Sequence, residues 1–358
     1  MRLTITGGCG FIGSAVARLA VARGHEVLNL DKMSYAATVA STAAIAGRDG
    51  YRHEIVDIGD QRTVRALLAE SKPEVVMHLA AESHVDRSID QPSDFVNTNV
   101  VGTVALLETV SEYYNGLTGE DRARFRFHHV STDEVFGSLG PRGAFTPDSP
   151  YDPRSPYAAS KASADHFARA WYHTYGLPVV VSNCSNNYGP FQFPEKLIPL
   201  ITIRGLTGAT LPVYGDGSNT REWLFVTDHA EALLRVAQSG EPGHTYLIAG
   251  ESERPNLEVV QAICSLLDEM APLDDGRAHR DLIEFVEDRP GHDLRYAIDG
   301  SATTAAFGWE ATTPFEVGLR KTVEWYIDNR DWWEPLVSDL RATERVGHGD
   351  RGPAEDAT

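Results

Sequence analysis

The stretch that decides the fold stands at the N-terminus and reads Arg2-Leu3-Thr4-Ile5-Thr6-Gly7-Gly8-Cys9-Gly10-Phe11-Ile12-Gly13. Its opening residues are typical of a short buried β-strand, and a helical periodicity begins at Phe11 and ends before Gly24. Between them the glycines follow a G-x-G-x-x-G pattern, which permits a tight turn and brings backbone N–H groups at a helix N-terminus close to a pyrophosphate. The stretch therefore predicts a strand, a loop and a helix that together bind a dinucleotide.

A carboxylate at the end of the next expected strand, residues 26–30, makes this prediction more specific. Asp31 stands about twenty residues beyond the glycines, where a carboxylate hydrogen-bonds a ribose 2′-hydroxyl and repels a 2′-phosphate. The pattern favours NAD over NADP, although Lys32 beside it weakens the preference. Asp57 and Ile58, at the end of a third expected strand, are candidates to flank the adenine.

Strands and helices alternate through the first half of the chain, which predicts an α/β fold, a Rossmann-type doubly wound parallel sheet. The expected strands are 51–56, 75–79, 125–131 and 178–182, and the expected helices are 62–71, 97–114 and 157–175. After about residue 188 glycine and proline interrupt shorter segments, which indicates a smaller C-terminal mixed α/β substrate domain. We expect a NAD-binding domain at 1–187 with 227–250 returning to it, a substrate domain at 188–335 with a helix at 314–329, and a disordered tail at 341–358.

The composition narrows the class of partner. The 358 residues carry 51 acids against 32 bases, a net charge of -19, which disfavours nucleic acid because an acidic chain repels a phosphate backbone. Cys9, Cys184 and Cys264 are too few and too widely spaced for a metal site, and they suggest reduced thiols in a cytoplasm. No apolar run reaches the length of a membrane span, and the N-terminal strand leaves no room for a signal peptide.

Tyr157 and Lys161 lie four residues apart on an expected helix and therefore share one face. A phenol with an ordinary pKa of about 10 is a poor base at neutral pH, but a neighbouring ammonium and a nicotinamide cation favour its ionised form. Lowering that pKa by about three units requires roughly 4 kcal/mol of differential stabilisation. Alone, the spacing also fits two surface residues. Together with the glycine loop it predicts a base that takes a proton from a sugar hydroxyl while hydride leaves for NAD.

Thr132, Asp133 and Glu134 directly follow the strand expected at 125–131. Adjacent side chains on an extended strand point to opposite faces, so the two carboxylates serve one cavity only if the chain turns there, and Gly137 permits a turn. Two close carboxyls resist double ionisation, so one keeps its proton and the pair offers an acid beside a base. β-Elimination of water needs such a pair; the alternative is two solvated loop acids.

The glycine loop, the Tyr157–Lys161 pair and their order along the chain resemble the extended short-chain dehydrogenase/reductase family, over about residues 2–333. The resemblance implies that 188–335 binds a nucleotide sugar, that NAD is retained as a catalytic cofactor, and that the helices at 97–114 and 157–175 form a homodimer. The cofactor-binding set that it implies is Gly7, Gly10, Phe11, Ile12, Gly13, Asp31, Lys32, Ser34, Asp57, Ile58, Leu79, Ala80, Ala81, Ser83, Thr98, Tyr157, Lys161 and Asn187.

The Thr-Asp-Glu triplet resembles that of the family's nucleotide-sugar 4,6-dehydratases, in particular those that act on dTDP-glucose. The implied reaction begins with oxidation at C4 by Tyr157 and Lys161, with Thr132 bonded to the same hydroxyl. Glu134 then removes the C5 proton, Asp133 protonates the departing C6 hydroxyl, and hydride returns to C6. This would be an early step towards deoxysugars such as rhamnose, and related epimerases generally lack the carboxylate pair.

The same resemblance assigns the substrate to residues from both halves of the chain. Arg221 and Arg289 are the cations expected at the diphosphate, because a guanidinium fork matches phosphate oxygens. The full expected set is Ser83, Thr132, Asn186, Lys196, Leu197, Pro212, Tyr214, Arg221, Asn256, Arg289 and His292.

Two departures and three alternatives accompany this interpretation. Phe136 stands where the family usually has tyrosine, and the loop at 138–150 is shorter than in many relatives, which leaves the cover of the sugar site open. A UDP-glucose 4,6-dehydratase shares the acidic triplet, and the one methyl that separates thymine from uracil is worth only about 1 kcal/mol. The others are a nucleotide-sugar 4-epimerase, which the carboxylate pair disfavours, and a catalytically silent NAD-binding protein, which the intact tyrosine and lysine disfavour.

Overall fold

Seven parallel strands form the central sheet of the structure, a computed structural model that describes residues 1–337. Their order is β10-β6-β5-β4-β1-β2-β3, and every neighbouring pair runs parallel, so the predicted Rossmann-type fold is confirmed. The order in which successive strands are added to the sheet reverses between β1 and β4, and ligands bind at such a reversal point in sheets of this kind. The strands are β1 (Arg2–Thr6), β2 (Glu26–Asp31), β3 (Tyr51–Ile55), β4 (Val75–His78), β5 (Arg126–Thr132), β6 (Val179–Cys184) and β10 (Thr245–Ile248).

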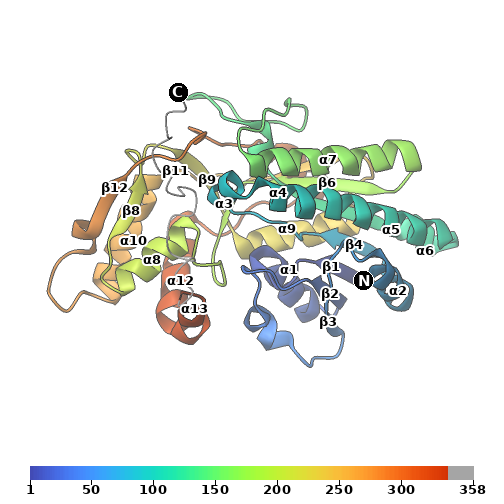
Figure 1. Ribbon diagram of the computed structural model, residues 1–358, viewed down its shortest axis with the longest axis horizontal. Coiled ribbons are helices and arrows are strands. Elements are labelled where there is room, and N and C mark those ends of the chain that lie inside the picture. Colours follow the sequence, from blue (N-terminus) through green and yellow to red (C-terminus); the bar gives the residue numbers. More distant parts are fainter. Residues whose placement is uncertain (338–358) are drawn as a thin grey trace, which may run out of the picture.

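Helices cover both faces of this sheet (Figure 1). Each face buries its own apolar core between helices and strands, which is how a two-sided sheet removes its hydrophobic surface from water. One face carries α1 (Phe11–Ala22) and α9 (Val226–Ser239), and the other carries α2 (Gln61–Ser71), α5 (Thr103–Gly116) and α7 (Pro156–Tyr175).

A smaller lobe, on the left in Figure 1, is built around a third apolar core. Its strands form a three-stranded sheet of β7 (Asn186–Tyr188), β9 (Thr220–Phe225) and β11 (Glu253–Pro255) and a two-stranded sheet of β8 (Leu211–Tyr214) and β12 (Ile283–Val286). Its longer helices are α8 (Leu197–Leu206), α10 (Asn256–Met270), α12 (Phe315–Asp328) and α13 (Arg330–Val337). The chain leaves this lobe after β9 to form α9 and β10 in the larger one, and then returns at β11.

The helix expected at 97–114 begins with a different geometry. Its first part, η2 (Val96–Gly102), is π-helical and continues directly into α5. Asn99 is buried in this wider turn, where its amide donates to the Glu82 carbonyl and the Ser160 hydroxyl, each at 2.9 Å, and its oxygen accepts from the Glu82 N–H at 2.8 Å. The π turn thus fixes the loop after β4 against α7, in keeping with the frequent use of such turns at functional sites.

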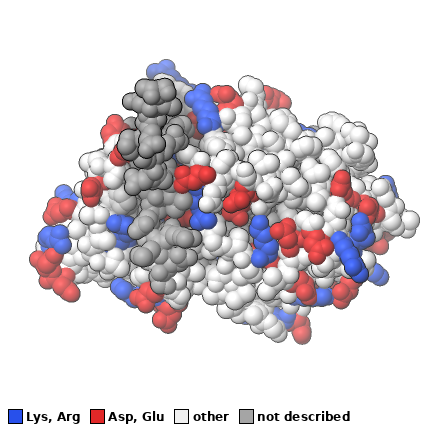
Figure 2. All heavy atoms as spheres, viewed as in Figure 1, with Lys and Arg blue, Asp and Glu red and all other residues white. Residues whose placement is uncertain are grey.

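Short helical turns complete the described chain. They are η1 (Val39–Ile45), α3 (Val85–Asp90), α4 (Pro92–Phe95), α6 (Gly119–Arg124), η3 (Asp133–Phe136), η4 (His279–Leu282) and α11 (Ser301–Phe307). The tail expected at 341–358 lies outside the described residues. Acidic and basic side chains are interspersed on the face shown in Figure 2 rather than gathered by sign. Among residues 1–337 no helix combines the length and the apolar character needed to cross a membrane.

Candidate active site

Two adjoining cavities open where the larger lobe meets the smaller one. The first cavity, of about 290 Å³, lies over the glycine loop and the ends of β4 and β5. The second cavity, of about 470 Å³, lies mainly between strands and helices of the smaller lobe. They form one continuous cleft, because six residues line both: Glu134, Asn186, Asn187, Gln192, Glu195 and Lys196.

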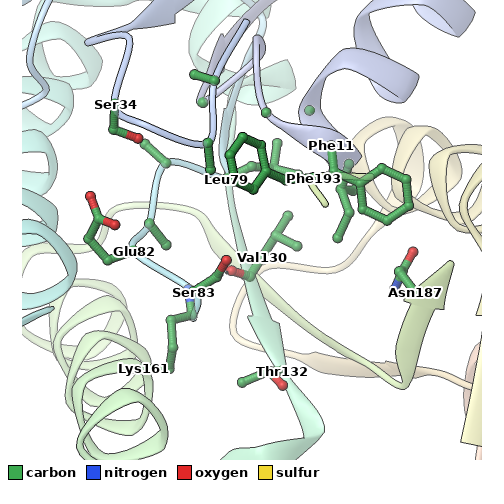
Figure 3. A pocket seen from close by; sticks show the side chains of 18 of the residues that line it. Phe11, Ser34, Leu79, Glu82, Ser83, Val130, Thr132, Lys161, Asn187 and Phe193 are labelled. Atoms are coloured by element: carbon green, nitrogen blue, oxygen red, sulfur yellow. Dashed lines mark hydrogen bonds between the residues drawn. The ribbon is translucent and has the colours of Figure 1, made fainter. Parts of the chain in front are cut away.

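The first cavity collects the residues that the sequence assigns to the cofactor, and Figure 3 shows several of them around it. Only Asp57 of that set does not line the cavity. Its side chain is more than half exposed, accepts a hydrogen bond from the Gly59 N–H at 2.8 Å, and lies 4.0 Å from the Lys32 ammonium. The residues that line it are Gly7, Gly10, Phe11, Ile12, Gly13, Asp31, Lys32, Ser34, Ile58, Leu79, Ala80, Ala81, Ser83, Thr98, Tyr157, Lys161 and Asn187.

The glycine loop leaves space that side chains would fill. A Cβ added at Gly13 would lie 2.2 Å from the Gly7 carbonyl oxygen, and one at Gly8 would lie 2.2 Å from the amide oxygen of Asn29. The backbone therefore closes tightly into the N-terminus of α1, whose first N–H groups have no helical partner and attract anions. This cradle fits the pyrophosphate of a dinucleotide.

We expect Gly13→Ala to weaken NAD binding about tenfold to a hundredfold, because relieving such a clash costs about 1–3 kcal/mol. NAD released by heat from the purified protein and counted per subunit measures the effect. Gly116→Ala is the control, because an added Cβ there meets nothing within 4 Å. An NAD content equal to that of the parent protein would show that the loop tolerates the methyl group.

The Asp31 carboxylate lies beside the glycine loop and bonds to its backbone. One carboxylate oxygen accepts from the Cys9 N–H at 2.9 Å and the other from the Met33 N–H at 2.8 Å. Each oxygen keeps a lone pair, so the carboxylate can still accept from a ribose hydroxyl. The ammonium of Lys32 donates to the Thr98 hydroxyl at 2.9 Å and lies 4.0 Å from Glu82. The Lys32 ammonium is therefore engaged by Thr98 and Glu82.

Tyr157 and Lys161 lie on the first turns of α7, which starts at a Ser155 cap that accepts from the Ala158 N–H. The Lys161 ammonium donates to the Val130 carbonyl of β5 at 2.9 Å, two residues before Thr132 at the end of the same strand. Burial and the carboxylate of Glu134 raise the pKa of the Tyr157 phenol well above its ordinary value, and a hydrogen bond with Thr132 opposes them. The protein by itself therefore keeps Tyr157 as a phenol. A bound cation is needed to favour the phenolate.

The two carboxylates reach one cavity because β5 ends at Thr132. The chain turns at once into η3, and Gly137 ends that turn with a φ of 84°. Burial and the neighbouring Glu134 and Glu222 raise the pKa of Asp133 well above its ordinary value. Burial also raises the pKa of Glu134, but the cations of Arg289, Lys196 and Arg221 oppose that rise. Asp133 is thus the member of the pair that holds its proton, and Glu134 is the one that ionises more readily.

The second cavity contains most of the residues expected at the substrate. Ser83 and Thr132 line the first cavity instead, together with residues such as Glu134 that line both cavities. The residues of the expected set that line the second cavity are Asn186, Lys196, Leu197, Pro212, Tyr214, Arg221, Asn256, Arg289 and His292.

The two arginines differ in how far their donors are already used. Arg221 is buried, donates to the carbonyls of Thr220 at 2.8 Å and Asp293 at 2.9 Å, and lies over the Tyr296 ring. Arg289 lies 3.6 Å from a carboxylate oxygen of Asp86, and its buried Nε has no partner among the described residues. Arg289 therefore retains a free donor for an anion.

Further side chains line the cleft beyond the two sets of expected site residues. His84, Asp86 and Tyr296 line the second cavity, and Glu195 lies between the two cavities. Burial raises the pKa of Glu195 to about 7. His84 and Asp86 stand one and three residues beyond the expected Ser83, and Glu195 stands next to the expected Lys196, which was a usable signal. Tyr296 stands in no recognisable motif.

Phe136 and the 138–150 loop lie away from the chemistry. The Phe136 ring is buried, stacks on Phe145 at 5.2 Å and meets Tyr151 edge-on at 5.1 Å. The loop is tied to the segment 295–299 through hydrogen bonds of its backbone, including Phe145 N–H to Ala297 O at 2.9 Å. Neither Phe136 nor any residue of the loop lines either cavity. The replacement of the family's usual tyrosine by Phe136 therefore changes no residue that lines the described cleft.

The polar clusters do not suggest a metal. Within residues 1–337 no group of three or more histidine, cysteine and acidic side chains is arranged to hold a metal ion. All three cysteines are free and buried.

Comparison with known proteins gives close relatives over nearly the whole chain. A family model described as GDP-mannose 4,6 dehydratase matches residues 4–322. A probable dTDP-glucose 4,6-dehydratase of Sinorhizobium fredii is 53% identical over 347 residues, which cover 97% of this chain and 99% of that protein. The structure of the dTDP-glucose 4,6-dehydratase of Bacillus anthracis in complex with NAD is 41% identical, with a TM-score of 0.83, and the match covers 94% of this chain and 99% of that one.

An epimerase shares the fold as well. The UDP-glucose 4-epimerase of Thermus thermophilus in complex with NAD is 27% identical, with a TM-score of 0.80, over 92% of this chain and 100% of that one. The overall fold is thus common to dehydratases and epimerases. The distinction between the two reactions must come from side chains in the cleft.

Proposed function

We propose, from the premise that this chain belongs to the GDP-mannose 4,6 dehydratase family of extended short-chain dehydrogenases/reductases, that it converts dTDP-glucose to dTDP-4-keto-6-deoxyglucose and recycles NAD. The enzyme is a hydro-lyase, and its product is a precursor of deoxysugars. The observation that carries the proposal is the pair Asp133 and Glu134, which lines the same cavity as Tyr157 and Lys161. The high identity to dTDP-glucose 4,6-dehydratases supports the choice of substrate.

The first step is oxidation at C4 of the sugar. Bound NAD supplies a hydride acceptor whose hydride later returns to the product. Tyr157 acts as the general base that removes the proton of the C4 hydroxyl, and Thr132 holds the same hydroxyl by a hydrogen bond. The Lys161 ammonium, held by the Val130 carbonyl, adds positive charge that favours the phenolate of Tyr157.

The second step is loss of water across C5 and C6. The C4 ketone makes the C5 hydrogen acidic, and Glu134 removes that proton. Asp133 gives its proton to the C6 hydroxyl, which leaves as water, so the two carboxyls exchange their protonation states. C6 is then reduced, and Glu134 returns a proton to C5. The raised pKa of Asp133 and the cations that face Glu134 support this division of roles.

The alternatives differ in what they require of the cleft. A 4-epimerase needs only oxidation and renewed reduction at C4, so it has no use for a buried carboxylic acid and a carboxylate at C5 and C6. A UDP-glucose dehydratase uses the same chemistry, and only contacts at the base of the nucleotide separate it from the proposed enzyme. A silent NAD-binding protein has no use for Tyr157 and Lys161 beside Thr132.

We also propose a cytoplasmic homodimer formed through η2, α5 and α7. Val96 and Val101 on η2 and Phe167 and Tyr175 on α7 are exposed apolar side chains, with exposed fractions between 38% and 60%. A face of this kind is buried when two copies pack together. Sedimentation of the full chain tests the proposal, and a monomer at micromolar concentration would overturn it.

Proton NMR of the protein with dTDP-glucose in deuterated water tests the function, with UDP-glucose run in parallel. The expected product has a new C6 methyl group and deuterium at C5, and it forms faster from dTDP-glucose. A sugar that returns unchanged, or as its C4 epimer, would refute the dehydration. Faster turnover of UDP-glucose would keep the reaction and change the substrate.

A further inference from the structure

A buried carboxylate that lines neither cavity lies one helical turn beyond Lys161. Asp165 is fully buried on α7 and receives three side-chain hydrogen bonds from three parts of the larger lobe. One oxygen lies 2.9 Å from His129 Nε2, and the other accepts from the Tyr151 hydroxyl at 2.8 Å and the Asn183 amide at 3.3 Å. The reaction described above makes no use of this residue.

The partners of Asp165 leave its charge uncompensated. Burial lowers the pKa of His129, and its Nδ1 has no partner among the described residues, so its ring is neutral and donates from Nε2. Although burial raises the pKa of Asp165, the hydrogen bond and the electrostatic influence of His129, followed by the charge of Lys161, bring it below its ordinary value. Asp165 is therefore a carboxylate surrounded by neutral donors, and Lys161 is the buried cation on the same face of α7.

The same carboxylate connects to the end of β5. The amide nitrogen of Asn183 that donates to Asp165 also donates to the Thr132 carbonyl, at 2.9 Å. β5 and β6 are paired at this point, where Thr132 faces Cys184. Asp165 thus interacts electrostatically with Lys161, and it is linked to the Thr132 carbonyl through the Asn183 amide.

We propose that Asp165 is a positioning residue for the reaction proposed above: it is the buried counter-charge that keeps Lys161 an ammonium, and through Asn183 it fixes the position of Thr132. Burial alone lowers the pKa of Lys161, because the charged form loses its hydration. Without the carboxylate, Lys161 becomes neutral more easily. The positive charge that favours the Tyr157 phenolate is then lost.

Other titratable groups face this site from every packed element. His78 of β4 lies with its ring centre 5.5 Å from that of His129, and burial keeps its pKa well below the ordinary value. Burial raises the pKa of Cys184 of β6, and burial with the charge of Asp165 raises that of Tyr151, so both stay neutral. Arg169 donates to the Tyr151 hydroxyl at 2.8 Å and is partly buried. Lys161 is therefore the buried charge that a change at Asp165 affects most.

The test is the pH profile of kcat for the full-length Asp165→Asn variant loaded with NAD. An opposite charge within about 4–6 Å shifts a pKa by about one to three units. We expect kcat at neutral pH to fall about tenfold or more, and the rising limb of the profile to move to higher pH by about one unit or more. Tyr151→Phe is the matched control, because it removes one hydrogen bond to Asp165 and keeps the charge; its profile should not move.

An equal loss of activity at every pH would show a structural role only and would overturn the proposal. Should Asp165→Asn lose NAD or fail to fold, Asp165→Ser leaves room for water among the same donors and carries the same test; failure of both variants to fold also overturns the proposal. The parent protein measured in parallel separates the two hypotheses. No dehydration by the parent refutes the proposed function, whereas a normal parent with an unshifted variant refutes only the role of Asp165.

Discussion

Replacing Tyr157 with phenylalanine is expected to lower kcat for dTDP-glucose by about 10³-fold while the protein keeps its NAD. The ring packs against Phe95 at 6.3 Å and lies in an apolar cluster with Val85, contacts that phenylalanine retains. Only the hydroxyl that takes the C4 proton is lost. Formation of the 4-keto sugar measures turnover, and NAD released by heat measures binding.

Tyr113→Phe is the control for this substitution. Its hydroxyl donates to the Pro73 carbonyl at 3.0 Å and lines neither cavity, so the variant should keep both turnover and NAD. Turnover of Tyr157→Phe close to that of the parent would remove the tyrosine from the mechanism. Loss of NAD together with turnover would instead assign Tyr157 to binding.

Substitutions in the pair Asp133 and Glu134 are expected to cause the second large loss of activity. Glu134→Gln is expected to abolish exchange of the C5 hydrogen with deuterated solvent and to lower product formation by about 10³-fold, because the amide cannot accept the proton. Asp133→Asn should lower product formation by a similar factor and yet allow C5 exchange, because the base is intact and only departure of the C6 hydroxyl is blocked. NMR at C5 and C6 reads both results from one sample.

The difference in C5 exchange between the two variants tests the assigned roles more directly than the loss of product formation in either variant. If Glu134→Gln exchanges C5 as fast as the parent, another residue is the base. If Asp133→Asn loses exchange as well, the two carboxyls do not divide the work as proposed. Both variants replace a carboxyl group by an amide of nearly the same size, so a difference in folding is not expected to separate them.

The parts of the fold that sequence reasoning reached are those fixed by local chemistry. The glycine loop needs close backbone approach, which no other residue type allows, and long apolar periods identify α1 and α7. The smaller lobe was harder, because β7 and β11 are only three residues long and their partner β9 lies far from both in sequence. Pairing of that kind depends on packing across the whole lobe, and no periodicity in the chain encodes it.

The site shows the same division. Motif residues such as Glu134 and Lys161 line the cleft, because strand ends and helix starts fix them. Asp57 looked equivalent to its neighbours in sequence, and only its exposed side chain separates it from them. That one carboxyl of the pair keeps its proton was expected from their adjacency, but the position of the cations that oppose protonation of Glu134 depends on the packing of the smaller lobe.

The late return of the chain to the central sheet affects how the protein emerges from the ribosome. α1 gains α9 only after about two hundred further residues have been made, and β6 gains its outer neighbour β10 only after about sixty. At typical elongation rates that interval lasts several seconds, during which a parallel strand edge and an apolar face are both uncovered. A nascent chain stalled in this interval is an aggregation hazard, so fragments that end before β10 are expected to need a chaperone to stay in solution.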